Sequence, residues 1–150
     1  MAKSVFEQIV DRSIETLSAS DLEGLTVIEY SAFYSCTSLK SVEIPNTVER
    51  IGSLSFSGCA GVSDITIPSR VNNIESLAFQ TWTSLKNVRF EQPAGMAITL
   101  PSAGASGGMF YIKSAYAINV YTDNETIKNY NWSADNRTAT LYHLDGTLWE

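Results

Sequence analysis

The chain has 150 residues, of which 44% are hydrophobic and 17% are charged. This length allows one domain of ordinary size, and the composition supplies enough apolar side chains for a buried core. Asp and Glu outnumber Lys and Arg by 16 to 10, which gives a formal net charge of -6, and the basic residues are scattered. Nucleic-acid-binding proteins neutralise phosphates with a concentrated basic surface, so the sequence argues against a nucleic-acid partner.

The N-terminal segment bears on export and on membranes. Glu7, Asp11 and Arg12 interrupt the stretch that a cleaved signal peptide would keep apolar. The sequence also lacks a run of about 18 apolar residues, the length that a membrane-spanning helix needs. We therefore expect neither export through a cleaved signal nor membrane insertion.

Residues 1–24 predict an N-terminal cap. Ser4 and Glu7 have the spacing of a capping box, in which each side chain satisfies a free backbone donor at a helix start. Residues 14–17 alternate and indicate a degenerate first strand. A docking arm for a partner protein is the alternative for the whole segment. The helix of about two turns would place four apolar residues on one stripe: Val5, Phe6, Ile9 and Val10.

The region 25–90 repeats itself every 23 residues without a gap. Five apolar columns stay in register over three units, and self-similarity at a period of 20–29 residues is typical of a leucine-rich-repeat solenoid. The columns are Ile28, Ile51 and Ile74; Phe33, Phe56 and Phe79; Leu39, Val62 and Leu85; Val42, Ile65 and Val88; and Ile44, Ile67 and Phe90.

Each unit contains one alternating tetrapeptide, at residues 41–44, 64–67 and 87–90. Apolar residues at every second position indicate a strand with one buried face. Pro45 and Pro68 follow two of these strands and end them, because proline has no N–H to donate to a ladder. We therefore expect a β-rich α/β leucine-rich-repeat solenoid of about three coils, in which parallel strands stack on one another.

The remaining chain predicts a loop at 91–108, rich in Gly, Ala, Ser and Pro, and a C-terminal α+β cap at 109–150. A solenoid exposes apolar surface and strand edges at its ends, so both ends need covering. The elements expected in the cap are strands at 110–112 and 117–122, a short helix at 123–130 with Asp123 as N-cap, a strand at 138–143, and a hairpin turn at Asp145-Gly146 before Thr147-Leu148-Trp149.

The repeat units resemble the BspA-type leucine-rich repeats, which read roughly as A-F-x-x-C-x-x-L followed by a strand that ends in I-P. The third unit departs from this pattern at Trp82 and at Phe90-Glu91, as a terminal coil would. The segment INVYTDNETIKNYNWS is similar to the one that closes the last coil in that family. The matching residues are Ala32-Phe33, Cys36, Leu39, Val42 and Ile44-Pro45 in the first unit, and Phe56, Cys59, Val62, Ile65 and Ile67-Pro68 in the second.

The sequence contains no residue pattern that predicts a catalytic, cofactor or metal site. His143 is the single histidine and lies in a predicted terminal strand, where a surface role is expected rather than that of a base. The carboxylates are scattered singly. Three N-glycosylation sequons, which begin at Asn124, Asn131 and Asn136, are interpreted as helix-cap and turn chemistry.

The two cysteines, Cys36 and Cys59, fall in one column of adjacent units. This position predicts two small core residues with free thiols. A disulfide between the neighbouring coils stays open as an alternative.

Outward-pointing strand residues define a candidate interaction face. Leucine-rich repeats commonly bind through this sheet, and the alternative is an ordinary solvated surface. The face comprises Ser41, Glu43, Asp64, Thr66, Asn87 and Arg89.

These observations favour a non-enzymatic structural or binding protein. The first hypothesis is a bacteriophage virion component, such as a capsid decoration, fibre or tail-associated protein, because residues 6–28 resemble phage-encoded members of the family. Its partners would be capsid or tail proteins, further copies in a homo-oligomer, and a host-surface protein or glycan. The second hypothesis is a bacterial cell-surface or secreted adhesin. Aromatic residues near both termini, expected to be exposed, are the candidate docking residues: Phe6, Tyr142 and Trp149.

Overall fold

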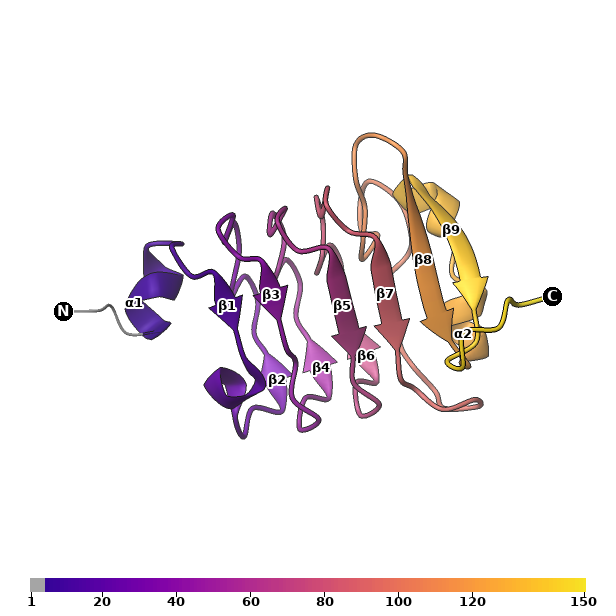
Figure 1. The fold of residues 1–150 in the computed structure, drawn as a ribbon, viewed down its shortest axis with the longest axis horizontal. Coiled ribbons are helices and arrows are strands. Elements are labelled where there is room, and N and C mark those ends of the chain that lie inside the picture. The colour runs from indigo at the N-terminus through magenta and orange to yellow at the C-terminus, as the bar shows by residue number, and fades with distance from the viewer. Residues whose placement is uncertain (1–4) are drawn as a thin grey trace.

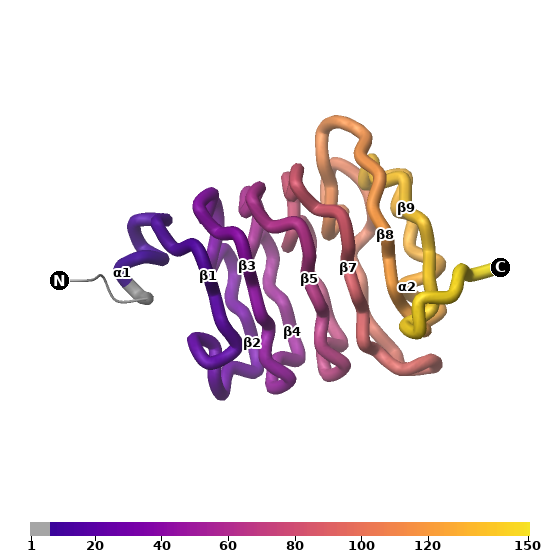
Figure 2. Tube along the Cα trace, viewed as in Figure 1, coloured from indigo at the N-terminus to yellow at the C-terminus, as the bar shows by residue number. Residues whose placement is uncertain are grey.

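A computed structural model describes residues 5–150, with the backbone alone at Val5 and Phe6. The chain winds into a solenoid whose long axis runs from the N-terminus to the C-terminus (Figures 1 and 2). Each turn contributes one strand to a front layer. In the described part of the chain this layer contains β1 (Thr16–Leu17), β3 (Ser41–Val42), β5 (Asp64–Ile67), β7 (Asn87–Phe90), β8 (Tyr116–Thr122) and β9 (Arg137–Tyr142).

A second, shorter ladder runs behind the front layer (Figure 1). It consists of β2 (Val27–Ile28), β4 (Arg50–Ile51) and β6 (Asn73–Ile74), which pair in parallel in that order. Asn73 continues this back layer through an isolated parallel bridge to Thr99. The solenoid is therefore flattened, with hydrogen-bonded strands on two sides of one apolar interior.

The front layer is divided into two hydrogen-bonded sheets. One sheet pairs β1 with β3, and the other has the order β5-β7-β8-β9. All of these pairs are parallel, as stacked turns require. Within residues 5–150, β3 and β5 lie in neighbouring turns without forming a ladder, whereas β4 behind them is paired on both sides. The front face is thus split at one place while the back layer is continuous.

The strands form where the sequence alternates. In β5, Ile65 and Ile67 point into the core while Asp64 and Thr66 are exposed, and β5 ends directly before Pro68. This alternation buries one face of each strand, and proline stops the ladder. The predicted strand positions at 64–67 and 87–90 are confirmed in full, and that at 41–44 is confirmed for its first half.

A ladder of phenylalanine rings forms the centre of the core. Phe33, Phe56, Phe79 and Phe110 stack at centroid distances of 5.0, 5.6 and 4.7 Å, with interplanar angles of 14° or less. Trp82 packs edge-on against three of these rings. Stacked and edge-to-face aromatic pairs are favourable beyond the area they bury, so this column ties four turns together.

The solenoid is longer than the three coils expected at 25–90. The predicted N-terminal cap contains the first turn, because Leu17 of β1 pairs with Val42 at a spacing of 25 residues. The predicted C-terminal cap contains the last two turns, in which Val88 pairs with Val120 and Val120 with Leu141, at spacings of 32 and 21. These unequal spacings hide the outer turns from a search at a period of 23.

Helices contribute little to either end. The N-terminal helix α1 covers only Val5–Val10, and its Val10 is 60% exposed although it was expected on the buried stripe. Ile9 does pack against the core. The predicted capping box includes Ser4, which lies outside the described residues. A short 3-10 helix, η1 (Ala19–Leu22), follows β1 and has its own capping box between Ser18 and Asp21.

Two predictions in the C-terminal region were wrong. Residues 110–112 do not form a strand: Phe110 ends a turn and occupies the next position of the phenylalanine ladder, and the two residues after it are irregular. The helix α2 covers Glu125–Lys128 and its N-cap is Asn124, whose Oδ1 accepts hydrogen bonds from two backbone N–H groups. Asp123 instead accepts a hydrogen bond from the N–H of Leu144 at 3.1 Å.

The end of the chain folds back on β9. Gly146 adopts a φ of +89° in the predicted turn, and a bridge joins Tyr142 to Leu148 in antiparallel fashion. The backbone N–H of Trp149 also donates to the carbonyl of Leu141 at 3.1 Å. The predicted hairpin is therefore present. It is a short tail that lies along the C-terminal end of β9, the last strand of the sheet.

Candidate functional site

The candidate face lies on the front layer and forms two rows across the strands. Asp64 pairs with Asn87 and Thr66 with Arg89, so each predicted row is in register across β5 and β7. The rows extend further than expected, to Asn119 and Tyr121 of β8. Ser41 and Glu43 are exposed on the other side of the split.

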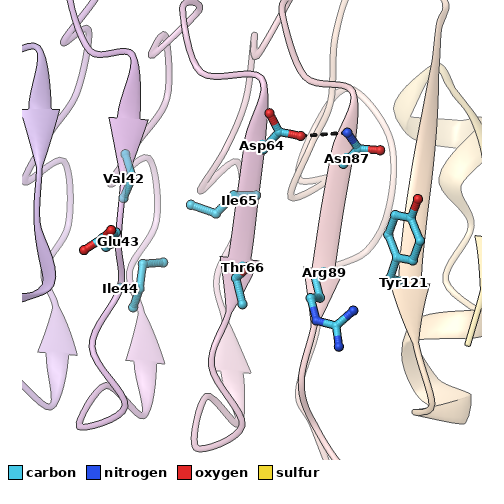
Figure 3. A pocket seen from close by; sticks show the side chains of 9 residues that line it. All are labelled: Val42, Glu43, Ile44, Asp64, Ile65, Thr66, Asn87, Arg89 and Tyr121. Carbon is cyan, nitrogen blue, oxygen red and sulfur yellow. Dashed lines mark hydrogen bonds between the residues drawn. The ribbon is translucent and has the colours of Figure 1, made fainter. Parts of the chain in front are cut away.

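The upper row is a ladder of polar side chains. Asn119 Nδ2 donates to Asn87 Oδ1 at 3.0 Å. Asn87 Nδ2 in turn donates to Asp64 Oδ1 at 2.6 Å, the contact drawn as a dashed line in Figure 3. The Ser63 hydroxyl donates to Asp64 Oδ2 at 2.6 Å. The hydrogen bonds from Ser63 and Asn87 lower the pKa of the Asp64 carboxyl. The ladder therefore ends in a carboxylate, and it ends at the split in the sheet.

A groove of about 410 Å³ runs along this face from β3 to β8. The lining comes from β3, the residues just after it, β5, β7 and β8, and Figure 3 shows these side chains. Buried apolar residues lie where β3 and β5 separate, and polar residues with one tyrosine line the rest. The lining residues are Val42, Glu43, Ile44, Asp64, Ile65, Thr66, Asn87, Arg89 and Tyr121. Five of the six residues predicted for the interaction face are in this set, and Ser41 is not.

Arg89 lies in the middle of the groove with its side chain 41% exposed. Its Nη1 donates to the carbonyl of Leu144 at 3.0 Å, and its Nε is 3.7 Å from Glu91. These contacts hold the guanidinium toward the C-terminal ends of the strands. The guanidinium is thus held by two contacts within the chain and remains partly exposed in the groove.

Tyr121 closes the groove on the C-terminal side. Its ring stacks on that of Tyr142 at 5.0 Å and 18°. Sequence reasoning placed residue 121 on a strand but not on the face, because the 32-residue spacing between Val88 and Val120 hid the register. The sequence signal that could have placed Tyr121 on this face is the alternation of apolar and polar residues within 117–122.

Two of the predicted docking aromatics are occupied within the chain, which corrects the expectation that they are exposed. Tyr142 is half-buried against Tyr121. Trp149 is half-buried as well: its ring stacks on His143 at 3.8 Å, Lys128 lies 4.0 Å above it, and its Nε1 donates to the carbonyl of Thr122. The side chain of Phe6, the third candidate, lies outside the described residues.

The remaining chemical groups have structural roles. His143 Nδ1 lies 3.0 Å from Asp123 beside the C-terminal tail. Asn124 and Asn131 cap helices, and Asn136 ends one in the left-handed conformation, which confirms the interpretation of the three sequons. The 3-10 helix that Asn131 caps, η2, covers Trp132–Asp135.

The buried polar cluster around Asp135 and Arg137 also has a structural role. Asp135 accepts hydrogen bonds from the backbone of Gly104 and Phe110 and from the Tyr130 hydroxyl at 2.7–3.1 Å. Arg137 donates to the carbonyls of Phe110 and Trp82, and burial lowers its pKa to about 10. These groups tie the long 91–115 connection to the last turn.

The cysteines are buried free thiols. The Cys59 thiol donates to the carbonyl of Phe33 at 3.3 Å, and burial raises its pKa to about 12. The described residues bring no three metal-ligating side chains together. Over residues 5–150, none of the helices has the length and apolar character of a membrane span.

Parallel turns of 21–32 residues, one front strand per turn and a stacked aromatic column define a leucine-rich-repeat solenoid. The chain belongs to the BspA-type leucine-rich-repeat family: the family model described as BspA type leucine rich repeat region, in six copies, matches residues 2–138. The six copies agree with the six front strands. Neither a curated protein nor a solved structure matches the chain. Repeats of this class are typically non-enzymatic scaffolds that mediate protein–protein interactions.

Proposed function

We propose that the protein is a non-enzymatic binding module that holds a protein partner on its front face. The groove along β3, β5, β7 and β8 supports this proposal, because it combines an apolar floor with polar groups in fixed positions. Protein interfaces have this composition, in which apolar contact supplies binding energy and the polar rim supplies orientation. A rigid stack of parallel strands needs little ordering upon association.

The experiment that tests this function places a photo-crosslinking amino acid at Thr66, which is exposed in the groove. Thr37, exposed in the turn before β3, is the matched control position. We expect one partner to be crosslinked from position 66 and not from position 37. Thr66→Arg should then weaken binding of that purified partner, whereas Thr37→Arg should not. Equal crosslinking and equal binding at both positions would exclude the front face as the interface.

For the biological setting we propose a bacteriophage virion component, such as a capsid decoration, fibre or tail-associated protein, assembled in the host cytoplasm. The resemblance of residues 6–28 to phage-encoded members of the family supports this setting. The partner on the front face would then be a capsid or tail protein or a host-surface protein. A bacterial cell-surface or secreted adhesin is the alternative.

Mass spectrometry of purified virions from the strain that encodes the chain separates the two settings. We expect the chain in the particles at a stoichiometry fixed relative to the major capsid protein. Recovery from the cell-surface fraction alone would favour the adhesin. The N-terminal docking hypothesis is tested by deleting residues 1–12, which should abolish attachment to particles while the turns stay folded.

A further inference from the structure

We propose that the partner inserts an aromatic side chain that stacks on Tyr121 and lies above Arg89. This inference rests on the proposed function and names the group by which the front face recognises its partner. Tyr121 and Arg89 are directly paired on β8 and β7 and lie side by side in Figure 3. Both line the groove.

The stacking geometry determines which way the open face of the Tyr121 ring points. Tyr142 and Tyr121 are paired residues on adjacent strands, and their rings are stacked at 5.0 Å. This distance is close to the spacing of about 4.8 Å between neighbouring strands, so the two rings are stacked one after the other along the strand order. Tyr142 covers one face of Tyr121. The other face is directed away from Tyr142, on the side of β7 and its paired residue Arg89.

Arg89 makes this position suitable for an aromatic ring and not for a second cation. Its guanidinium is held by Leu144 and Glu91 and remains 41% exposed. A cationic side chain at this position would be repelled by the guanidinium, whereas a neutral aromatic ring would not be. An aromatic ring thus gains a stacking contact with Tyr121 at a site where the Arg89 guanidinium disfavours a second cation.

The neighbouring residues leave space for such a ring. Thr66 is the next residue of the same row, a short side chain paired with Arg89 across β5 and β7. It is exposed, and it lines the groove together with the other two residues. This row of the groove therefore begins with the short side chain of Thr66, continues with Arg89 and ends at the aromatic ring of Tyr121. Aromatic anchors in such positions frequently dominate protein interfaces.

The first experiment titrates the isotope-labelled full chain with N-acetyl-tryptophanamide and, as the matched probe, N-acetyl-leucinamide. We expect the indole probe to move the Tyr121 ring-proton resonances upfield and to shift the amides of Thr66 and Arg89, at millimolar affinity. The leucine probe should not produce these shifts. Tyr121→Phe should retain the response and Tyr121→Leu should lose it. Tyr30→Leu, at a tyrosine that is 68% exposed, is the control and should leave the response unchanged.

The second experiment uses the partner identified by crosslinking at Thr66. We expect Tyr121→Leu to weaken its binding by about tenfold or more, which corresponds to about 1.4 kcal/mol, with Tyr121→Phe close to the unaltered chain. If Thr66→Arg abolishes binding but Tyr121→Leu does not, the aromatic anchor is excluded and the binding face stands. Equal shifts from the indole and leucine probes, or shifts that persist in folded Tyr121→Leu, would also overturn the inference. If neither variant affects the partner, both proposals fail.

Discussion

The carboxylate of Asp135 occupies the space that a side chain on Gly108 would need. A Cβ atom built on Gly108 overlaps Asp135 Oδ1, which accepts the backbone N–H of Gly104 at 2.7 Å. The 91–115 connection can therefore approach the last turn only with glycine at this position. One residue without a side chain allows a buried carboxylate to join two distant segments.

Gly108→Ala should destabilise the chain by at least about 2 kcal/mol, because either the backbone or the buried carboxylate must move. Gly107→Ala is the matched control, since a Cβ there meets the carbonyl oxygen of Ser102 at 3.2 Å, a contact that a small adjustment relieves. Urea unfolding of both variants measures the difference. Equal stability of the two variants would contradict the packing described for Asp135.

Phe56→Ala should cost about 3–5 kcal/mol, the usual range for removing a buried phenylalanine. Phe56 has ring neighbours on both sides in the ladder and is fully buried. Tyr34→Ala, at a residue that is 44% exposed, serves as the control and should change stability by about 0.5 kcal/mol or less. Thermal and urea unfolding report both values. A small effect at Phe56 would mean that the aromatic column does not hold the turns together.

Cys36 and Cys59 should react slowly with a thiol reagent such as DTNB at pH 8. The thiolate is the reactive form, and burial raises the pKa of Cys59 to about 12 and that of Cys36 above its ordinary value. Unfolding in urea should release both thiols for rapid reaction. Rapid labelling of the native chain would contradict the burial, and a mass two units lower under non-reducing conditions would reveal the disulfide that the sequence left open.

Ser63→Ala should raise the pKa of the Asp64 carboxyl toward its ordinary value of 3.8, because the Ser63 hydroxyl makes the largest contribution to lowering it. The direction of the pH dependence of stability follows from the lowered pKa of Asp64. The stabilising contribution of the charged carboxylate is fully present above pH 3.8 and disappears as the pH falls through the lowered pKa. Carboxyl NMR titration measures the shift, with Ser41→Ala as control. An unchanged Asp64 titration would show that the Ser63 hydrogen bond does not operate.

The interior of the solenoid could be predicted from the sequence where the period is constant. The columns of Phe33, Phe56 and Phe79 stack as expected, because equal spacing brings equivalent residues into register. Phe110, the fourth ring, follows Phe79 by 31 residues, so a fixed period cannot find it. The long connection after β7 extends one turn without disturbing the column. Only three-dimensional packing reveals that this turn is part of the repeat.

The register of the candidate interaction face was predicted in its centre and missed on its C-terminal side. Thr66 and Arg89 follow from alternation within perfect repeats, whereas Tyr121 depends on the pairing of β8 with β7. The split between β3 and β5 has no sequence signal, since both strands carry the same alternating pattern. The contacts that bury Trp149 were also hidden, because Lys128 and His143 meet it only after the last turn has formed.

The split front layer interrupts the hydrogen bonding on one side of the solenoid only. On the front, β3 and β5 belong to separate sheets, while on the back β4 is hydrogen-bonded to both neighbours. Backbone N–H groups of Ser31, Phe33 and Ser35 also donate to the carbonyls of Ser53, Ser55 and Ser57 in the next turn, so the turns on either side of the split stay joined along the back and along one edge. The break is therefore confined to the front, where it leaves Val42, Ile44 and Ile65 side by side in the lining of the groove between two sheets that the rest of the solenoid holds in place.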